Sequence, residues 1–240
     1  MYYRRLGRTE LMVAEVGLGT DSFDASDRDG TVAAVTAALD GGTSLVEFDA
    51  SDAAMAVAIG EAVAQRRLHV MLVATGEGDI GELEAAIAQP GVSRIDGYLL
   101  QPTAADALAA LRASGLCDVI GVAAPDAAAA LEAIEGGGID VVQLPYAFGG
   151  EDLGAVLDAA AEAGVAVLGG SPLAGGELIG GDAGAALDAY CEGEPRTRAQ
   201  AAIAWALTEP RLAAVVPGAR NVEQAAENAE ASRAAPLPMA

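Results

Sequence analysis

Eight short, strongly apolar segments alternate with longer alanine-rich segments along this chain of 240 residues, and this alternation limits the fold more than any other feature. Continuous runs of Val, Ile and Leu that end in polar or glycine-containing turns are typical of parallel strands covered by helices. We predict strands at Ala14–Thr20, Ser44–Asp49, His69–Thr75, Ile95–Gln101, Asp118–Ala123, Ile139–Pro145, Val165–Gly170 and Leu212–Pro217.

The intervening segments carry helix start and stop signals, a polar residue at the first turn and glycine just past the last. The predicted helices are Thr31–Asp40, a segment after Asp79, Thr103–Ser114, Asp126–Glu135, Asp152–Ala163 and a final helix headed by Asn221, with Gln224 at capping-box spacing. Eight such units predict an α/β fold, a (β/α)8 TIM barrel, with residues 1–240 as a single domain. The alternative is a doubly wound open sheet, which the lack of Gly-x-Gly-x-x-Gly after the first strand disfavours.

The charge balance excludes several classes of partner. The formal net charge is −22, from 35 acidic residues and 13 arginines, and the chain contains no lysine. Such a surface repels nucleic acid and anionic membranes, which leaves a small molecule as the expected ligand. Either adaptation to high salt or a GC-rich genome would explain this composition. The sequence leaves the oligomeric state open.

The two cysteines, Cys117 and Cys191, have neither metal-ligand spacing nor a disulfide pattern, so we expect no metal site. No segment has the character of a signal peptide or the length of a membrane span. We therefore expect the reducing cytoplasm as the location.

Short motifs, in order along the chain, resemble those of the aldo-keto reductases. They are YRRLGRT at residues 3–9, VAEVGLGT at 13–20, ALDGG at 38–42, YLLQP at 98–102, IGV at 120–122, VVQLPY at 141–146, SPLAGG at 171–176, AWAL at 204–207 and VPGA at 216–219, followed by Gln224, Glu227 and Asn228. The resemblance implies a (β/α)8 barrel with an N-terminal β-hairpin, here Tyr2–Val13, across its N-terminal end. It also implies carbonyl reduction with a nicotinamide cofactor.

The residues that this family uses for catalysis are a Tyr acid, a Lys and an Asp that lower its pKa, and a His that orients the substrate. Gly76 stands at the Lys position and Gln101 at the His position. In a gapless register Glu47 takes the Asp position and Asp52 the Tyr position; a gapped register gives the Asp role to Asp49. Neither register supplies a Tyr.

The cofactor contacts implied by the resemblance are eroded in the same way. Ala123 and Ala124 replace a Ser-Asn pair, Gly170 replaces an aromatic residue or Arg, and the loop after Gly175 is short. The residues that persist as vestigial cofactor candidates are Gln143, Ser171, Gly218, Gln224, Glu227 and Asn228. We therefore expect no binding of NADP(H), or weak binding.

The candidate catalytic residues are Glu47, Asp49, Asp52 and Gln101, because they lie at or just past the carboxyl ends of strands, where barrel enzymes keep their sites. Paired carboxylates beside an apolar barrel can serve as acid and base. The alternative is that these carboxylates belong only to the acidic surface of the protein. A similar alternative for Gln224 is that it only caps the last helix.

Three functions stay open. They are a barrel that binds a small molecule or partner without redox chemistry, a non-redox lyase or isomerase that uses these carboxylates, and an atypical NAD(P)H-dependent oxidoreductase.

Overall fold

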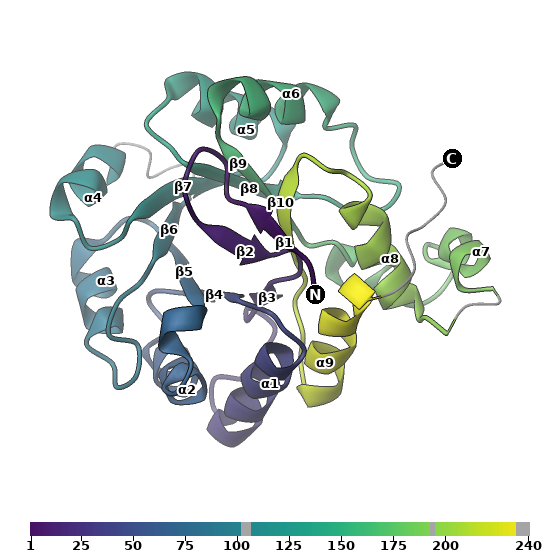
Figure 1. Cartoon of the computed structure of the whole chain (residues 1–240), viewed down its shortest axis with the longest axis horizontal. Helices are drawn as coiled ribbons and strands as arrows, with labels where there is room; N and C mark the ends of the chain where they lie inside the picture. Colours follow the sequence, from purple (N-terminus) through teal and green to yellow (C-terminus); the bar gives the residue numbers. More distant parts are fainter. Residues whose placement is uncertain (102–106, 193–194, 234–240) are drawn as a thin grey trace.

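The computed structural model describes residues 1–101, 107–192 and 195–233 and shows parallel strands surrounded by helices (Figure 1). The strands are β1 (Tyr3–Arg5), β2 (Met12–Ala14), β3 (Leu18–Gly19), β4 (Leu45–Asp49), β5 (Met71–Gly76), β6 (Gly97–Leu100), β7 (Val119–Ala123), β8 (Val141–Pro145), β9 (Ala166–Gly170) and β10 (Leu212–Val216). The helices are α1 (Arg28–Asp40), α2 (Ala53–Val63), α3 (Ile80–Ile87), α4 (Leu108–Ser114), α5 (Ala127–Gly136), α6 (Gly154–Ala163), α7 (Asp188–Cys191), α8 (Arg198–Leu207) and α9 (Val222–Glu230). The predicted (β/α)8 barrel is confirmed.

Strands β3 to β10 are hydrogen-bonded in chain order, and the first and last of them close the ring. Two parallel bridges join the ends of the sheet: Val16, just before β3, pairs with Val215 of β10, and Gly19 of β3 pairs with Gly218, just past β10. The amide of Gly17 donates to the carbonyl of Val215 at 2.8 Å, which continues the ladder around the ring. Closure removes the free sheet edges that a doubly wound sheet would leave.

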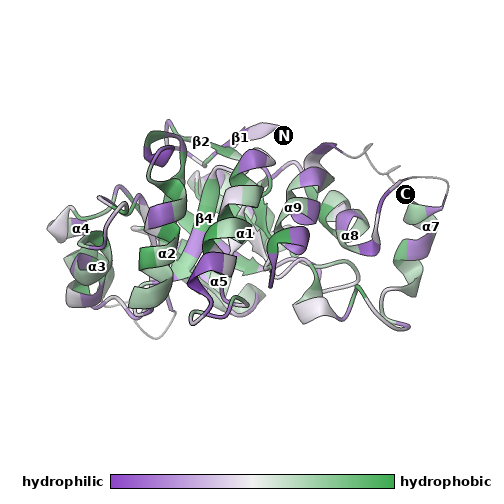
Figure 2. Ribbon diagram, turned by 90° about the horizontal axis from the view of Figure 1, so that it is seen from below, coloured by the Kyte–Doolittle hydropathy of each residue, from purple (hydrophilic) through white to green (hydrophobic). Residues whose placement is uncertain are grey.

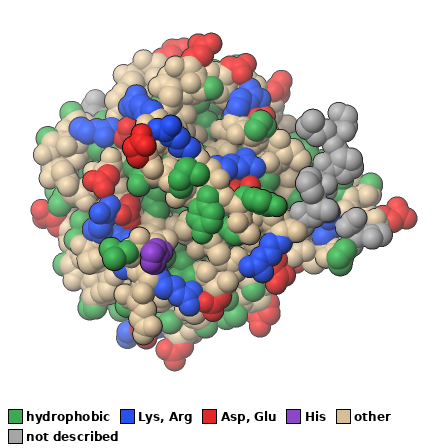
Figure 3. Space-filling model, viewed as in Figure 1, with side chains coloured by type: hydrophobic (Ala, Val, Ile, Leu, Met, Phe, Trp, Pro, Cys, Tyr) green, Lys and Arg blue, Asp and Glu red, His purple; other side chains and the backbone are tan. Residues whose placement is uncertain are grey.

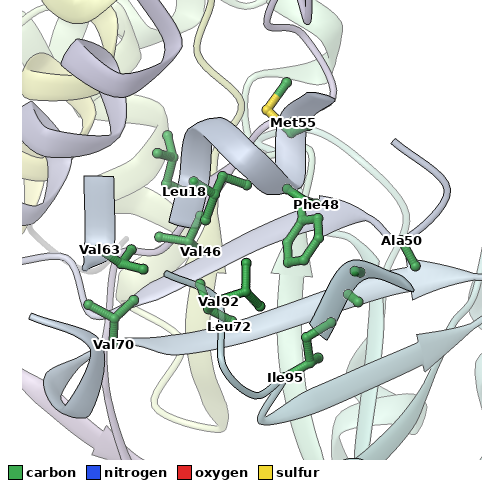
Figure 4. Packing of buried hydrophobic residues seen from close by; sticks show 14 of the residues in the cluster. Leu18, Val46, Phe48, Ala50, Met55, Val63, Val70, Leu72, Val92 and Ile95 are labelled. Atoms are coloured by element: carbon green, nitrogen blue, oxygen red, sulfur yellow. The ribbon is translucent and has the colours of Figure 1, made fainter. Parts of the chain in front are cut away.

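Alternate residues of each strand enter two different cores, because successive side chains of a strand point to opposite faces. In β4, Leu45 packs inside the barrel. Val46 and Phe48 pack outside it, against helical residues such as Met55 of α2 (Figure 4). Hydrophobic residues are therefore concentrated on the strands, and the purple polar positions lie mainly on the surrounding helices and loops (Figure 2). This alternation places Glu47 on the same inward-facing side as Leu45.

An N-terminal hairpin covers one end of the barrel, as predicted. Strands β1 and β2 pair antiparallel, with Tyr3 opposite Ala14. Leu6 and Val13 are buried among the inward-facing residues of the barrel strands. The hairpin therefore fills the end of the barrel that lies opposite the carboxyl ends of the strands, and it leaves only that second end available for a site.

Polar side chains cap most of the helices. Asp79 accepts from the amides that begin α3, and Asn221 accepts from the amide of Gln224 at 2.9 Å, both at positions predicted as caps. The Gln224 side chain accepts from the amide of Arg220 rather than that of Asn221, so the predicted capping box is displaced by one residue. Of the predicted helix Thr103–Ser114, residues 103–106 lie outside the described residues, and the described part is α4.

Arginine side chains gather on the face that carries the hairpin (Figure 3), and several of them clamp strand ends together. Asp140 accepts from the amide of Ile120 in β7 at 3.1 Å and from Arg112 at 2.9 Å, and Arg8 lies 3.2 Å away. Asp96 occupies the equivalent place before β6, where it accepts from the amide of Leu72. Each carboxylate thus joins its own strand to the preceding strand.

Replacing Asp140 by Ala is expected to lower the free energy of unfolding by about 2 kcal/mol, because the buried Ile120 amide and two guanidinium groups lose their acceptor. Burial raises the pKa of Asp140, but the Ile120 amide and the Arg112 guanidinium together hold it below its ordinary value. The difference in unfolding free energy between the wild type and Asp140→Ala should therefore shrink in acid, as the pH falls through the folded-state pKa of Asp140.

The matched control is Asp118→Ala, which removes an exposed carboxylate that pairs with Arg94 and should cost no more than about 1 kcal/mol. Urea unfolding at pH 7 measures both variants. Equal losses in the two would show that the clamp does not stabilise the barrel.

None of the helices in the described part of the chain is long and apolar enough to cross a membrane.

Candidate functional site

A cavity of about 360 Å³ opens at the carboxyl ends of the barrel strands, opposite the hairpin. Residues in or just past seven of the eight barrel strands, all but β5, contribute to its described wall. The polar side chains that line it are Asp21, Ser22, Glu47, Gln101, Gln143, Ser171, Arg220 and Gln224. Apolar residues such as Leu144, Leu173 and Ile179 cover the remaining wall. A wall that combines apolar side chains with a few polar ones is the usual composition of a small-molecule site.

Glu47 and Gln143 form the centre of the cavity. Their strands, β4 and β8, are four places apart in the ring, so the two side chains come from opposite walls. Gln143 Nε2 donates to Glu47 Oε2 at 2.7 Å, and both side chains are buried. This contact therefore spans the inside of the barrel one layer above Leu45.

The pKa of Glu47 is raised to about 7, first by burial and second by the negative charge of Asp21, and the Gln143 hydrogen bond partly offsets both effects. The pKa of Asp21 is also raised, first by burial and second by Asp49. A carboxyl that titrates near neutral pH can both give and take a proton. The sequence analysis missed Asp21; the available signal was its position one residue after the predicted first strand.

The other candidate carboxylates serve the local backbone. Asp52 caps α2 by accepting from the amide of Met55 at 2.9 Å. Asp49 accepts from both the amide and the hydroxyl of Ser51. Within the described residues, neither side chain lines the cavity, whereas Gln101 does. The structure therefore pairs Glu47 with Asp21 rather than with Asp49 or Asp52.

The cofactor candidates divide into two groups. Those that line the cavity are Gln143, Ser171, Gly218 and Gln224. Asn228 is buried, and its amide donates to the carbonyl of Gly218 at 3.0 Å. The carbonyl of Glu227 accepts from the side chain of Gln200. Asn228 therefore ties α9 to the segment after β10, the Glu227 carbonyl ties α9 to α8, and neither residue lines the cavity.

Gly76 and Gln101 occupy the positions that the resemblance gives to Lys and His. A Cβ atom on Gly76 would meet the hydroxyl oxygen of Tyr98. That hydroxyl accepts from the amide of Gly78, and the ring is buried outside the barrel with Phe48. His69 precedes β5, at the hairpin end. Within the described residues, no Tyr or His side chain lines the cavity.

Comparison with known proteins agrees with this architecture. Residues 91–239 match the model of the aldo/keto reductase family. No curated protein sequence matches the chain.

Solved structures match along almost the whole chain. Aldo-keto reductase AKR11C1 from Bacillus halodurans, in its holo form, superposes with a TM-score of 0.83 at 19% identity, covering 99% of this chain and 93% of that one. The thermostable aldo-keto reductase Tm1743, solved with the inhibitor epalrestat, gives 0.81 at 24% identity, with 100% and 96% covered. An aldo/keto reductase from Klebsiella pneumoniae, solved with NADP and acetate, gives 0.78 at 22% identity, with 95% and 89% covered. With a family match over more than half of its length, this chain belongs to the aldo/keto reductase family.

Proposed function

We propose that this barrel binds a small polar molecule at its mouth and has lost NADPH-dependent carbonyl reduction. The observation that carries the proposal is the lining of the cavity. The described residues of the lining include no Tyr or His, and the chain has no Lys. The centre of the cavity holds the Glu47–Gln143 hydrogen bond. The pocket is retained while the reducing side chains of the family have no counterpart in it.

Carbonyl reduction needs a proton donor beside the developing alkoxide, and a Tyr serves at neutral pH when a cation lowers its pKa. The tyrosines near the barrel are placed for packing. Tyr98 is buried outside the strands, and Tyr146 stacks on Trp205 with ring centroids 5.4 Å apart. Burial raises the pKa of both phenols, which makes them weaker acids.

The nicotinamide end of an NADP(H) molecule does not fit the residues present. Ala123, Ala124 and Gly170 offer it no polar or aromatic side chain. The Gln143 amide already donates to Glu47, and the cavity floor is acidic. At the adenosine end, Gln224 is engaged with the backbone of Arg220. We therefore assign no chemical step to this cofactor.

A fluorescence titration is expected to give a dissociation constant for NADPH well above 1 μM, because adenosine-end contacts alone leave the ring unpositioned. The NADP-binding reductase from Klebsiella pneumoniae, titrated in parallel, shows that the assay detects binding. A dissociation constant of about 1 μM or tighter, roughly −8 kcal/mol, would contradict the proposal.

The binding half of the proposal is tested by blocking the cavity. A Cβ atom on Gly170 would lie 3.4 Å from Gln143 Cγ, an ordinary contact, and Gly170 lines the cavity, so we expect the ring of Gly170→Phe to take up cavity space. Small polar molecules that raise the unfolding temperature of the wild type should not stabilise this variant. The control is Gly180→Phe, where a Cβ meets no atom within 4 Å. A compound that stabilises both variants equally binds elsewhere.

A further inference from the structure

Two acceptor atoms that line the cavity receive no hydrogen bond from the described residues. Gln143 Nε2 and Glu47 Oε2 bond to each other, but within the described residues neither Glu47 Oε1 nor Gln143 Oε1 receives a hydrogen bond. Glu47 is 6% exposed and Gln143 9% exposed, and both line the cavity. Both oxygens are therefore free to accept from a molecule in the cavity, and a ligand that supplies N–H groups can bond to both of them.

The charge at the floor selects among possible donors. Asp21 lines the same cavity and raises the pKa of Glu47, so the two carboxyls lie close enough to interact. A hydroxyl group would satisfy the hydrogen bonds but leave this repulsion in place. A primary ammonium supplies three donors and a positive charge together.

A positive group stands at another part of the same cavity. Arg220 lines it from the segment between β10 and α9, and its backbone is held by the Gln224 side chain at 2.9 Å. Within the described residues, no hydrogen bond or ion pair of its guanidinium is present, although the chain has 35 acidic residues and 13 arginines. An exposed guanidinium on a fixed segment is suited to a carboxylate or another anion.

We infer that the mouth binds a small zwitterion whose ammonium group lies between Glu47, Gln143 and Asp21 and whose anionic group faces Arg220. This inference rests on the proposed function, because it names the ligand class for the same cavity. An ω-amino acid has this chemistry. The opposite charges at floor and rim then set both the orientation and the length of the ligand.

Binding should release protons. A bound ammonium favours the carboxylate form of Glu47, whose pKa in the free protein is about 7. The groups that face Glu47 are Asp21 from the loop after β3 and Gln143 from β8; its neighbours in register, Gly19 and Val73, are uncharged. About half a proton per ligand should leave at pH 7, which calorimetry in buffers of different ionisation enthalpy measures.

The test is isothermal titration of the full chain with ω-amino acids of increasing length, and with the plain alkylamine and alkanoate of each length. One length should bind tightest, with the matching alkylamine and alkanoate at least about 10-fold weaker, the size of one lost charged hydrogen bond. Glu47→Gln should weaken the best ligand at least 10-fold and reduce proton release, whereas Arg220→Gln should weaken it and leave proton release unchanged.

Asp118→Asn is the matched control, since it removes an exposed charge at the hairpin end that does not line the cavity and should leave the affinity within about 2-fold. An alkylamine as tight as the amino acid would overturn the role of Arg220, and an alkanoate as tight would overturn that of Glu47. If no member binds, the zwitterion inference fails, while a different compound blocked by Gly170→Phe would still support the proposed function. Carbonyl reduction with NADPH would instead refute the proposed function itself.

Discussion

Purified protein supplied with NADPH and a broad panel of aldehydes and ketones is expected to turn over far below 1 s⁻¹, the lower end of the ordinary enzyme range. A missing general acid costs about 10²–10⁴-fold, and groups that only tune that acid do not multiply this cost. Poor placement of the nicotinamide adds a further loss. NADPH consumption followed at 340 nm measures the rate, with an active family member as the positive control.

A single substitution should not restore this activity. In Gly76→Lys the new Cβ would meet the buried Tyr98 hydroxyl, so the side chain enters the packing outside the barrel and no Tyr waits at the mouth to be activated. If the wild type does turn over near 1 s⁻¹, an unrecognised acid exists. Glu47, with its pKa near 7, is then the first candidate, and Glu47→Ala should abolish the rate.

Glu47→Gln is expected to stabilise the fold at alkaline pH by about 3 kcal/mol. The folded-state pKa of Glu47 is about 7 against an ordinary value of 4.5, so the folded protein binds the proton more tightly than the unfolded chain does. Stability from this group is therefore present below about pH 4.5 and is lost as the pH rises through about 7. The neutral Gln keeps an acceptor for Gln143 and avoids the buried charge.

Urea unfolding of the wild type and of Glu47→Gln between pH 4.5 and 8.5 tests this. The other carboxyls are the same in both proteins, so the difference in their free energies of unfolding reports on Glu47 alone. The difference should be small at pH 4.5 and grow to its full size above pH 7. Glu61→Gln is the control, since Glu61 is exposed and pairs with Arg28, and this variant should differ from the wild type by no more than about 1 kcal/mol. A flat difference for Glu47→Gln would show that Glu47 titrates at its ordinary pKa.

The barrel was predictable from the sequence because each strand combines an unbroken apolar run with a turn signal, and both are local properties. The boundaries of β4 and β9 differ from the predicted strands by one residue at one end. Helix α2 received no prediction of its own. Its residues, Ala53–Val63, are nearly all apolar, so the 3.6-residue alternation that marks an amphipathic helix is hidden.

The candidate site was less predictable, because it depends on contacts between residues far apart in the chain. Glu47 and Gln143 were both candidates, but for separate catalytic and cofactor roles; their hydrogen bond joins residues 96 positions apart. Asp52 looked equally acidic in the sequence, and its position just before an apolar segment was the available signal for a helix cap. Local sequence cannot distinguish a capping carboxylate from one that enters a cavity.

The strand clamps at the hairpin end make this barrel a favourable starting point for directed evolution. Asp96 and Asp140 are tied to backbone amides and arginines at the end remote from the cavity, so their stabilisation does not depend on the residues at the mouth. Libraries at Gln101, Ala123 and Gly170 would vary the cavity wall while leaving those contacts intact. New ligand specificities should therefore be selectable without prior stabilisation of the scaffold.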